Sequence, residues 1–335
     1  MTNFYKMLFA TTLITGTMIS ISSYSWFSMW MGLEINLLSM IPLMKEKSIY
    51  SSESALKYFI TQTLASSAIL FSIIMLSNTE EFIPQNSNYF LLLMMNSALL
   101  TKLGAAPFHS WFPEVLEGID WFNCLIMLTW QKIAPMILIM YNLSMNMFIT
   151  SIILISSLTG SILGVNQISL RKIMAYSSIN HIGWMIASMF SLSTWLTYFL
   201  VYCIITINIV VLFMIHKTLW LSQINSLLTQ SKYFKMNFML NFLSLGGIPP
   251  FLGFFPKWIT INLMANCGFF MLSFTLIVLT LLTMFFYLRI TFSSLTINSS
   301  EILIKKDNNS MFLANFTNLI SISGILLCTL IPNLT

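Results

Sequence analysis

Apolar runs recur along the whole 335-residue chain and are separated by short polar connections. Each run is about 20 residues long, which is the length of a transmembrane helix, whereas transmembrane β-strands give a weaker alternation. Only 7% of the residues are charged and 57% are hydrophobic, against roughly 25% charged residues in soluble domains. The sequence therefore predicts an all-α polytopic transmembrane bundle, with residues 1–335 forming a single integral membrane domain.

Hydropathy and turn residues predict eleven spans in this bundle. The expected ranges are 4–22, 24–44, 54–77, 88–112, 121–141, 147–166, 171–190, 194–215, 237–263, 268–290 and 312–332.

The positions of the cations support this count and give an orientation. If the eleven spans alternate in direction, twelve cations fall on the side of the membrane that holds the N-terminus, and the opposite side receives none. These are Lys6, Lys45, Lys47, Lys57, Arg171, Lys172, Lys217, Lys232, Lys235, Arg289, Lys305 and Lys306. The positive-inside rule makes their side the inner face.

Composition excludes several other kinds of function. Nothing in the chain resembles a basic nucleic-acid surface, so no nucleic-acid partner is expected. The cysteines Cys124, Cys203, Cys267 and Cys328 lie far apart in apolar runs. Such isolated cysteines indicate small core residues and not a disulfide frame, a zinc site or an iron–sulfur site.

The stretch from Leu243 to Trp258 predicts an interrupted helix in the ninth span. Its glycines and prolines remove backbone donors and destabilise a continuous helix, and it ends with a charge, Lys257. Broken backbone within a membrane is tolerated only where protein or a water-filled cavity surrounds it. We interpret Lys257 as part of an ion or proton site; the alternative is a proline-kinked helix whose lysine reaches the membrane surface.

A second break signature, Gly104 to His109, lies in the fourth span and directly follows Lys102. Two interrupted spans five positions apart cross the membrane in opposite directions, as the matching members of an inverted repeat do. The predicted halves are residues 1–141, with spans one to five, and residues 147–290, with spans six to ten. Residues 312–335 then form an extra C-terminal helix.

Three further charges are predicted to be buried. Glu34 and Lys132 lie ten to eleven residues into their spans, which places them roughly 15 Å deep in a core about 30 Å thick. Lys102 is similarly deep. Each charge could belong to a structural ion pair, but two deep lysines beside a glutamate favour a proton relay, because a desolvated lysine can release and recapture a proton.

The histidines and the surface acids leave alternatives open. His181 lies mid-span with Ser177 one turn before it, so it could pass protons or only make a hydrogen bond within the bundle. His109 could gate or stabilise the first break. The acids Glu114, Glu117 and Asp120 predict a solvated rim, with a proton-collecting surface as the alternative.

Five motifs in this order resemble the antiporter-like membrane subunits of respiratory complex I, and the resemblance covers nearly the whole chain. The motifs are Trp30 to Asn36, Lys102 to His109, Thr129 to Pro135, Arg171 to His181 and Leu245 to Trp258.

The resemblance implies a proton-translocating core subunit of the membrane arm of NADH:ubiquinone oxidoreductase. Glu34 would pair with Lys102, Lys132 would link to the centre, Lys257 would be the terminal proton donor and His181 would support the path. The chain would have no redox centre and bind no cofactor of its own, while NADH, FMN, iron–sulfur clusters and ubiquinone would act elsewhere in the complex. The other membrane-arm subunits and inner-membrane lipids would be its partners.

The resemblance also implies a multi-pass protein of the mitochondrial inner membrane, with the N-terminus in the matrix and the C-terminus in the intermembrane space. Two alternative functions use the same residues. One is a free-standing cation/proton antiporter, and the other is a structural membrane subunit that does not pump.

Overall fold

The computed structural model describes residues 2–45, 48–78, 85–143, 147–223, 232–249 and 251–296. Over these ranges the chain forms helices and no strand, and one isolated bridge joins Ser169 to Trp220. The predicted all-helical class is confirmed. The expected span 312–332, together with Lys47, Lys305, Lys306 and Cys328, lies outside the described residues.

The chain divides into two compact units, residues 1–149 and residues 150–335. The helices that begin in the first unit are α1 (Thr2–Ser22), α2 (Trp26–Met44), α3 (Ile49–Asn78), α4 (Gln85–Leu103), α5 (Trp111–Gly118), α6 (Trp121–Leu128), α7 (Trp130–Tyr141) and α8 (Met147–Val165), which continues into the second unit. The rest of the second unit contains α9 (Leu170–Ala187), the 3-10 turn η1 (Ser188–Phe190), α10 (Leu192–His216), α12 (Lys232–Gly246), α13 (Phe254–Asn266) and α14 (Phe270–Thr296).

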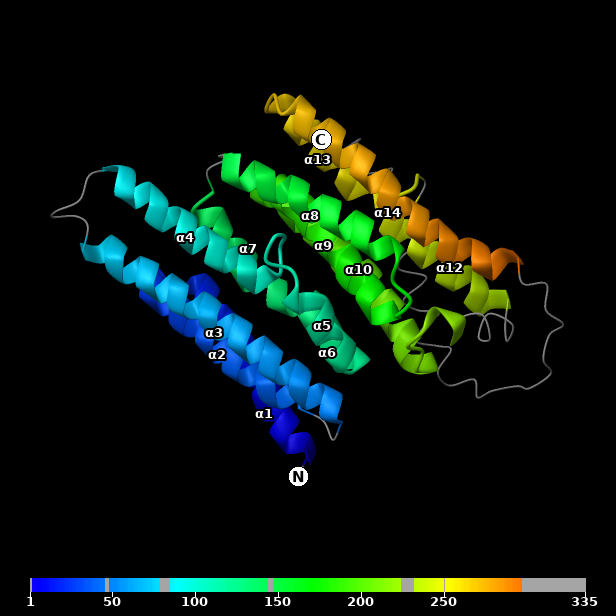
Figure 1. Cartoon of the computed structure of the whole chain (residues 1–335), viewed down its shortest axis with the longest axis horizontal. Coiled ribbons are helices and arrows are strands. Elements are labelled where there is room, and N and C mark those ends of the chain that lie inside the picture. Colours follow the sequence, from blue (N-terminus) through cyan, green and yellow to red (C-terminus); the bar gives the residue numbers. More distant parts are fainter. Residues whose placement is uncertain are drawn as a thin grey trace. The chain divides into compact units, whose positions relative to one another are not determined.

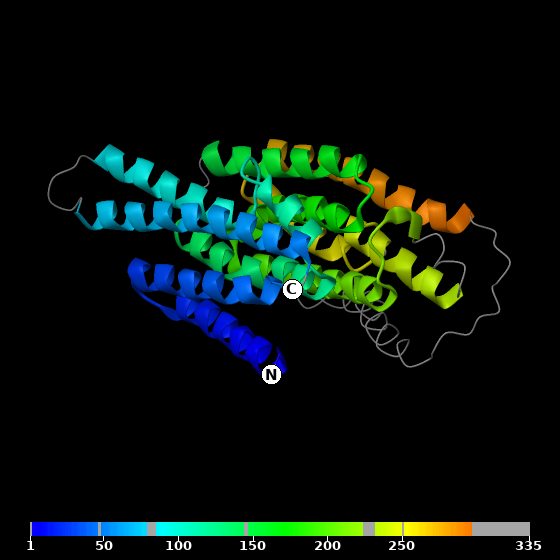
Figure 2. The same cartoon turned by 60° about the horizontal axis from the view of Figure 1, so that its bottom comes forward.

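In the first unit, α3 packs against α2, α4 and α5, and α7 packs against α1 and α4. Figures 1 and 2 show α3 and α4 side by side. The helices α1 and α2 approach closely where Gly32 faces α1. A Cβ added to Gly32 would lie 2.5 Å from the backbone nitrogen of Ser20, so this contact depends on a small residue, as in many membrane helix pairs.

In the second unit, α12 packs between α10 and α14, and α13 contacts α9, α10 and α14. The pairing of α12 with α14 is visible in both views. Helix α9 is the most enclosed of these elements, since nearly all of its residues from Ile173 to Ala187 are buried. A helix surrounded by protein can carry more polar residues than one facing lipid, which explains the Ser-Ser-Ile-Asn-His sequence in its centre.

Seven helices in the described part of the chain are long and apolar enough to cross a membrane. They begin at Phe4, Trp26, Ile49, Trp121, Met147, Leu192 and Phe270. The chain is thus a multi-pass membrane protein by length and composition, and the count of eleven stays a prediction. The expected fourth span, 88–112, contains most of α4, a non-helical segment and the start of α5. The ninth, 237–263, contains parts of α12 and α13 with another such segment between them.

The expected fifth span, 121–141, contains a discontinuity that the sequence analysis did not predict. Helix α6 ends at Leu128 and α7 begins at Trp130, with Thr129 between them. Pro135 lies inside α7 and has no N–H to donate to the carbonyl of Gln131. The backbone is therefore irregular on both sides of Lys132.

Candidate functional site at two helix breaks

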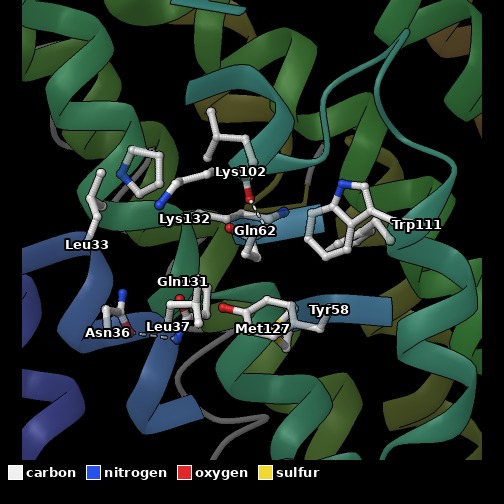
Figure 3. A pocket seen from close by; sticks show the side chains of 13 residues that line it. Leu33, Asn36, Leu37, Tyr58, Gln62, Lys102, Trp111, Met127, Gln131 and Lys132 are labelled. Carbon is white, nitrogen blue, oxygen red and sulfur yellow. Dashed lines mark hydrogen bonds between the residues drawn. The ribbon is translucent and has the colours of Figure 1, made fainter. Parts of the chain in front are cut away.

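A small cavity in the first unit brings together two of the predicted site residues, Lys102 and Lys132. Its volume is about 20 Å³, which is room for about one water molecule. The side chains are 7% and 1% exposed, respectively. Figure 3 shows both lysines among the lining residues, which also include Tyr58, Gln62 and Trp111.

Lys102 lies at the C-terminal end of α4, where the helix stops because Gly104 adopts a left-handed conformation with φ of 73°. Two side chains donate to backbone carbonyls in the last turn of the helix. The indole N–H of Trp111 donates to the carbonyl of Thr101 at 3.1 Å, and Nε2 of Gln62 donates to the carbonyl of Lys102 at 3.5 Å. These contacts hold the end of α4 beside the cavity.

Lys132 reaches the same cavity from α7. Its ammonium lies 5.9 Å from the centre of the Phe112 ring, within range of a cation–π interaction. The neighbouring Gln131 donates through Nε2 to Oδ1 of Asn36 on α2, at 2.9 Å. This hydrogen bond ties α7 to α2 next to the lysine.

Glu34 approaches from α2. Its side chain is half-buried, and its charge acts on both Lys102 and Tyr58. The residues of α2 that line the cavity are Leu33, Asn36 and Leu37. Glu34 thus lies within electrostatic range of Lys102 but does not itself line the cavity.

In the second unit, Lys257 lies on α13, just after the break that follows α12. Its Nζ donates to the carbonyl of Gly246, the last residue of α12, at 2.6 Å, and lies 5.9 Å from the centre of the Trp184 ring. In a straight helix these eleven residues would rise roughly 16 Å, which a lysine side chain cannot span. The segment from Gly247 to Gly253 therefore turns the chain back, so that Lys257 caps the helix that precedes it.

His181 lies on α9 and is 6% exposed. Its Nδ1 makes a 2.9 Å hydrogen bond with the hydroxyl of Tyr198 on α10, and its ring contacts that of Tyr202. His181 and Tyr198 line a cavity of about 10 Å³ together with Gly253, the last residue of the second break, and Pro256 on α13. The histidine thus shares a small cavity with residues close in sequence to Lys257.

The two breaks have the same local layout. Seven residues separate the helices in each case, and each begins with a glycine of positive φ, Gly104 or Gly247. The segments Gly104-Ala-Ala-Pro-Phe-His-Ser-Trp-Phe-Pro-Glu114 and Gly247-Ile-Pro-Pro-Phe-Leu-Gly-Phe-Phe-Pro-Lys257 share Gly, Pro, Phe, Phe and Pro at matching positions. In this correspondence Glu114 is the counterpart of Lys257, and each is the fourth residue of the helix after its break.

The first unit therefore brings Lys102 and Lys132 to one cavity with Glu34 in electrostatic range, and in the second unit both Lys257 and His181 lie near the break. The polar and aromatic partners of these residues were not predicted from the sequence; they are Tyr58, Gln62, Trp111, Gln131, Trp184 and Tyr198. A usable signal existed only for Tyr198 and Tyr202, which lie four residues apart on one helix face.

The chain matches the family model for the transmembrane region of NADH:quinone oxidoreductase and Mrp antiporter subunits over residues 23–283. It belongs to this family of membrane subunits. The resemblance drawn from the five motifs is confirmed.

Relatives indicate the branch of the family. The chain is 48% identical to NADH-ubiquinone oxidoreductase chain 2 of Anopheles gambiae, covering 97% of each sequence. It is 37% identical to the protein of that name from Oryctolagus cuniculus, covering 84% of this chain and 83% of the relative.

Solved structures share the fold. A chain of respiratory complex I from Thermus thermophilus superposes with a TM-score of 0.87 at 21% identity, covering 98% of this chain and 80% of that chain. A chain of the Mrp complex from a Dietzia species superposes with a TM-score of 0.78 at 15% identity, covering 97% and 75%. At sequence identities this low, the similarity shows a shared fold and nothing about function.

Proposed function

We propose that this chain is a membrane-arm subunit of NADH:ubiquinone oxidoreductase that moves protons from the matrix to the intermembrane space. Electron transfer from NADH to ubiquinone elsewhere in the complex would supply the energy. The names of the curated relatives and the family match support this assignment. The observation that carries the proton-translocating role is the pair of buried lysines that line one cavity beside a helix break.

In the first unit, a proton would be held at Nζ of Lys102 and passed toward Nζ of Lys132. Burial disfavours an ammonium, and a nearby carboxylate offsets this cost. The charge of Glu34 would therefore stabilise the protonated form of Lys102 when the two groups are close. Moving Glu34 away, or bringing another cation near, would favour release of the proton into the cavity.

In the second unit, Lys257 would act as the terminal donor. The carbonyl of Gly246 and the face of Trp184 stabilise its ammonium. A change in the distance between the end of α12 and α13 would remove one of these stabilising contacts. His181, with its hydrogen bond to Tyr198, would support transfer next to this break.

The number of spans, the inverted repeat and the orientation in the membrane are part of the same proposal. The chain would cross the mitochondrial inner membrane eleven times as two inverted halves, residues 1–141 and 147–290, followed by the helix at 312–335. The fourth and ninth spans would be the interrupted ones. The N-terminus would lie in the matrix and the C-terminus in the intermembrane space, with other membrane-arm subunits and lipids as partners and all redox cofactors elsewhere.

The proposal predicts that Lys102→Ala and Glu34→Ala each lower the number of protons pumped per electron. Removing a positioned proton-transfer group slows such a step by about 100-fold or more. The measurement is proton uptake per NADH oxidised by the intact complex in proteoliposomes.

The other functions give different results in the same experiment. A normal proton-to-electron ratio and a normal turnover rate in both variants would indicate a structural subunit that does not pump. A protein that migrates alone on a native gel and exchanges Na⁺ for H⁺ in liposomes would instead be a free-standing antiporter.

A further inference from the structure

Helix α5 lies along the first turns of α3 and is held there at three successive places. At one end, a Cβ added to Gly118 would lie 2.7 Å from the carbonyl oxygen of Tyr50, so the two backbones are in close contact. At the other end, the Trp111 ring packs on that of Tyr58, with centroids 6.0 Å apart. A helix of eight residues is marginal by itself, so these contacts with α3 decide where α5 lies.

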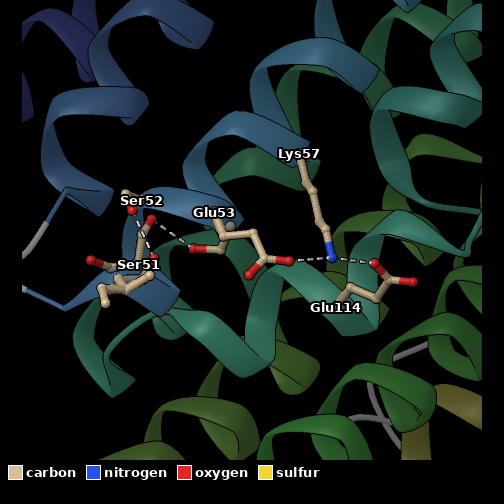
Figure 4. Close-up of polar contacts among 7 residues, drawn as sticks. Ser51, Ser52, Glu53, Lys57 and Glu114 are labelled. Atoms are coloured by element: carbon tan, nitrogen blue, oxygen red, sulfur yellow. Dashed lines mark hydrogen bonds and ion pairs between the residues drawn. The ribbon is translucent and has the colours of Figure 1, made fainter.

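An ion pair forms the central contact. Nζ of Lys57 on α3 donates to Oε2 of Glu114 on α5 at 2.9 Å, and the same ammonium lies 3.0 Å from Oε1 of Glu53 (Figure 4). The two carboxylates differ in what they connect. Glu53 is on α3 itself, one turn before Lys57, whereas Glu114 joins α3 to the helix that follows the break.

The position of α5 matters because its first two residues form part of the lysine cavity. Trp111 and Phe112 both line the cavity. Trp111 also binds the carbonyl of Thr101, next to Lys102, and Phe112 faces the ammonium of Lys132. A displacement of α5 along α3 would therefore move Trp111, which binds the helix end next to Lys102, and Phe112, which faces Lys132.

The second break offers independent support for an anchoring role of the residue at the position of Glu114. Lys257 is the counterpart of Glu114 and connects its own short helix, α13, to the end of α12 through the carbonyl of Gly246. The fourth residue after the break thus anchors the following helix in both units. The partner is a backbone carbonyl in one unit and Lys57 in the other.

We infer that Lys57 and Glu114 are positioning residues that fix α5 against α3 and so keep Trp111 and Phe112 in place around the two lysines. This inference rests on the proposed proton transfer for its functional consequence. Its structural part, the anchoring of α5, stands apart from that proposal.

The test compares Glu114→Gln with Glu53→Gln in the intact complex. Both variants remove one carboxylate from Lys57, but only the first breaks the contact between helices. Hydrogen–deuterium exchange in peptides covering residues 104–118 should become about two- to fivefold faster in Glu114→Gln, the range that one partly exposed ion pair supports. In Glu53→Gln, exchange should stay at the wild-type rate.

Proton pumping per NADH in proteoliposomes gives the functional comparison. Glu114→Gln should show a partial loss relative to Glu53→Gln. The triple variant Glu53→Lys, Lys57→Glu and Glu114→Lys reverses every charge and keeps both pairs, so it should recover exchange protection and pumping. Glu114→Asp, compared with Glu53→Asp, provides a milder pair of variants if Glu114→Gln does not assemble.

Equal exchange in Glu114→Gln and Glu53→Gln would overturn the anchoring of α5. Faster exchange with unchanged pumping would overturn the positioning role. Lys102→Ala, run in parallel, separates the two proposals: normal pumping in Lys102→Ala would refute the relay, while the exchange comparison would still decide whether the ion pair holds α5.

Discussion

Lys257 has an observed structural contact and a proposed role in proton transfer, and a single substitution can separate the two. Its ammonium donates a hydrogen bond to the end of α12, and under the proposed mechanism it also gives up a proton. Arginine keeps a positive charge and donors but cannot be deprotonated in proteins. Structure and proton release therefore respond differently to Lys257→Arg.

We predict that Lys257→Arg assembles into the complex but loses proton pumping, because the proton-transfer step from this residue becomes about 100-fold slower. The measurement is the ratio of protons to electrons, with complex assembly followed on a native gel. Lys45→Arg, at an exposed position after α2, is the matched control and should change neither quantity. Wild-type pumping in Lys257→Arg would show that this lysine does not need to release a proton.

At the scale of elements, the two breaks differ at the last residue before the second helix. Gly253 precedes α13, and a Cβ added to it would lie 1.7 Å from the carbonyl oxygen of Ser244. The counterpart before α5 is Ser110, which already carries a Cβ and is exposed. The second break is therefore the more tightly packed of the two at this position.

This difference predicts that Gly253→Ala strongly lowers the thermal stability of the assembled complex. The added methyl group meets backbone rather than a flexible side chain, so α12 and α13 must separate at a cost of about 1–3 kcal/mol or more. Ser110→Ala should stay within about 0.5 kcal/mol of the wild type. Thermal inactivation of the intact complex measures both variants, and equal midpoints would contradict the tight packing at Gly253.

At the scale of the whole molecule, the distribution of cations predicts which ends of the helices face the matrix. Helix α2 offers a convenient test, because Tyr24 and Lys45 lie at its opposite ends and are both exposed. In a Cys267→Ser background, which removes an exposed native thiol, a cysteine can be introduced at either position.

We expect a membrane-impermeant thiol reagent to label Lys45→Cys from the matrix side and Tyr24→Cys from the intermembrane side. Inverted inner-membrane vesicles and mitoplasts present the two faces separately. Labelling of both positions from one side would refute the predicted path of α2, and labelling with the two sides exchanged would refute the orientation.

Much of the architecture follows from the sequence because its causes are local. Long apolar runs must form helices in a membrane, since every backbone polar group needs an internal partner there. Clusters of glycine and proline mark both breaks in the sequence, and Gly104 and Gly247 adopt positive φ there. The discontinuity at Thr129 was missed because no glycine marks it.

The sequence by itself determined the membrane class, the helical segments and which charges are enclosed by apolar residues. Only the tertiary structure decided which groups meet: Lys102 with Lys132, Lys57 with Glu114, and Lys257 with the carbonyl of Gly246. The physical reason is that the face of a membrane helix turned to lipid and the face turned to its neighbours are both apolar. Hydrophobic patterning therefore leaves the rotation and the partners of each helix open, and close packing selects them.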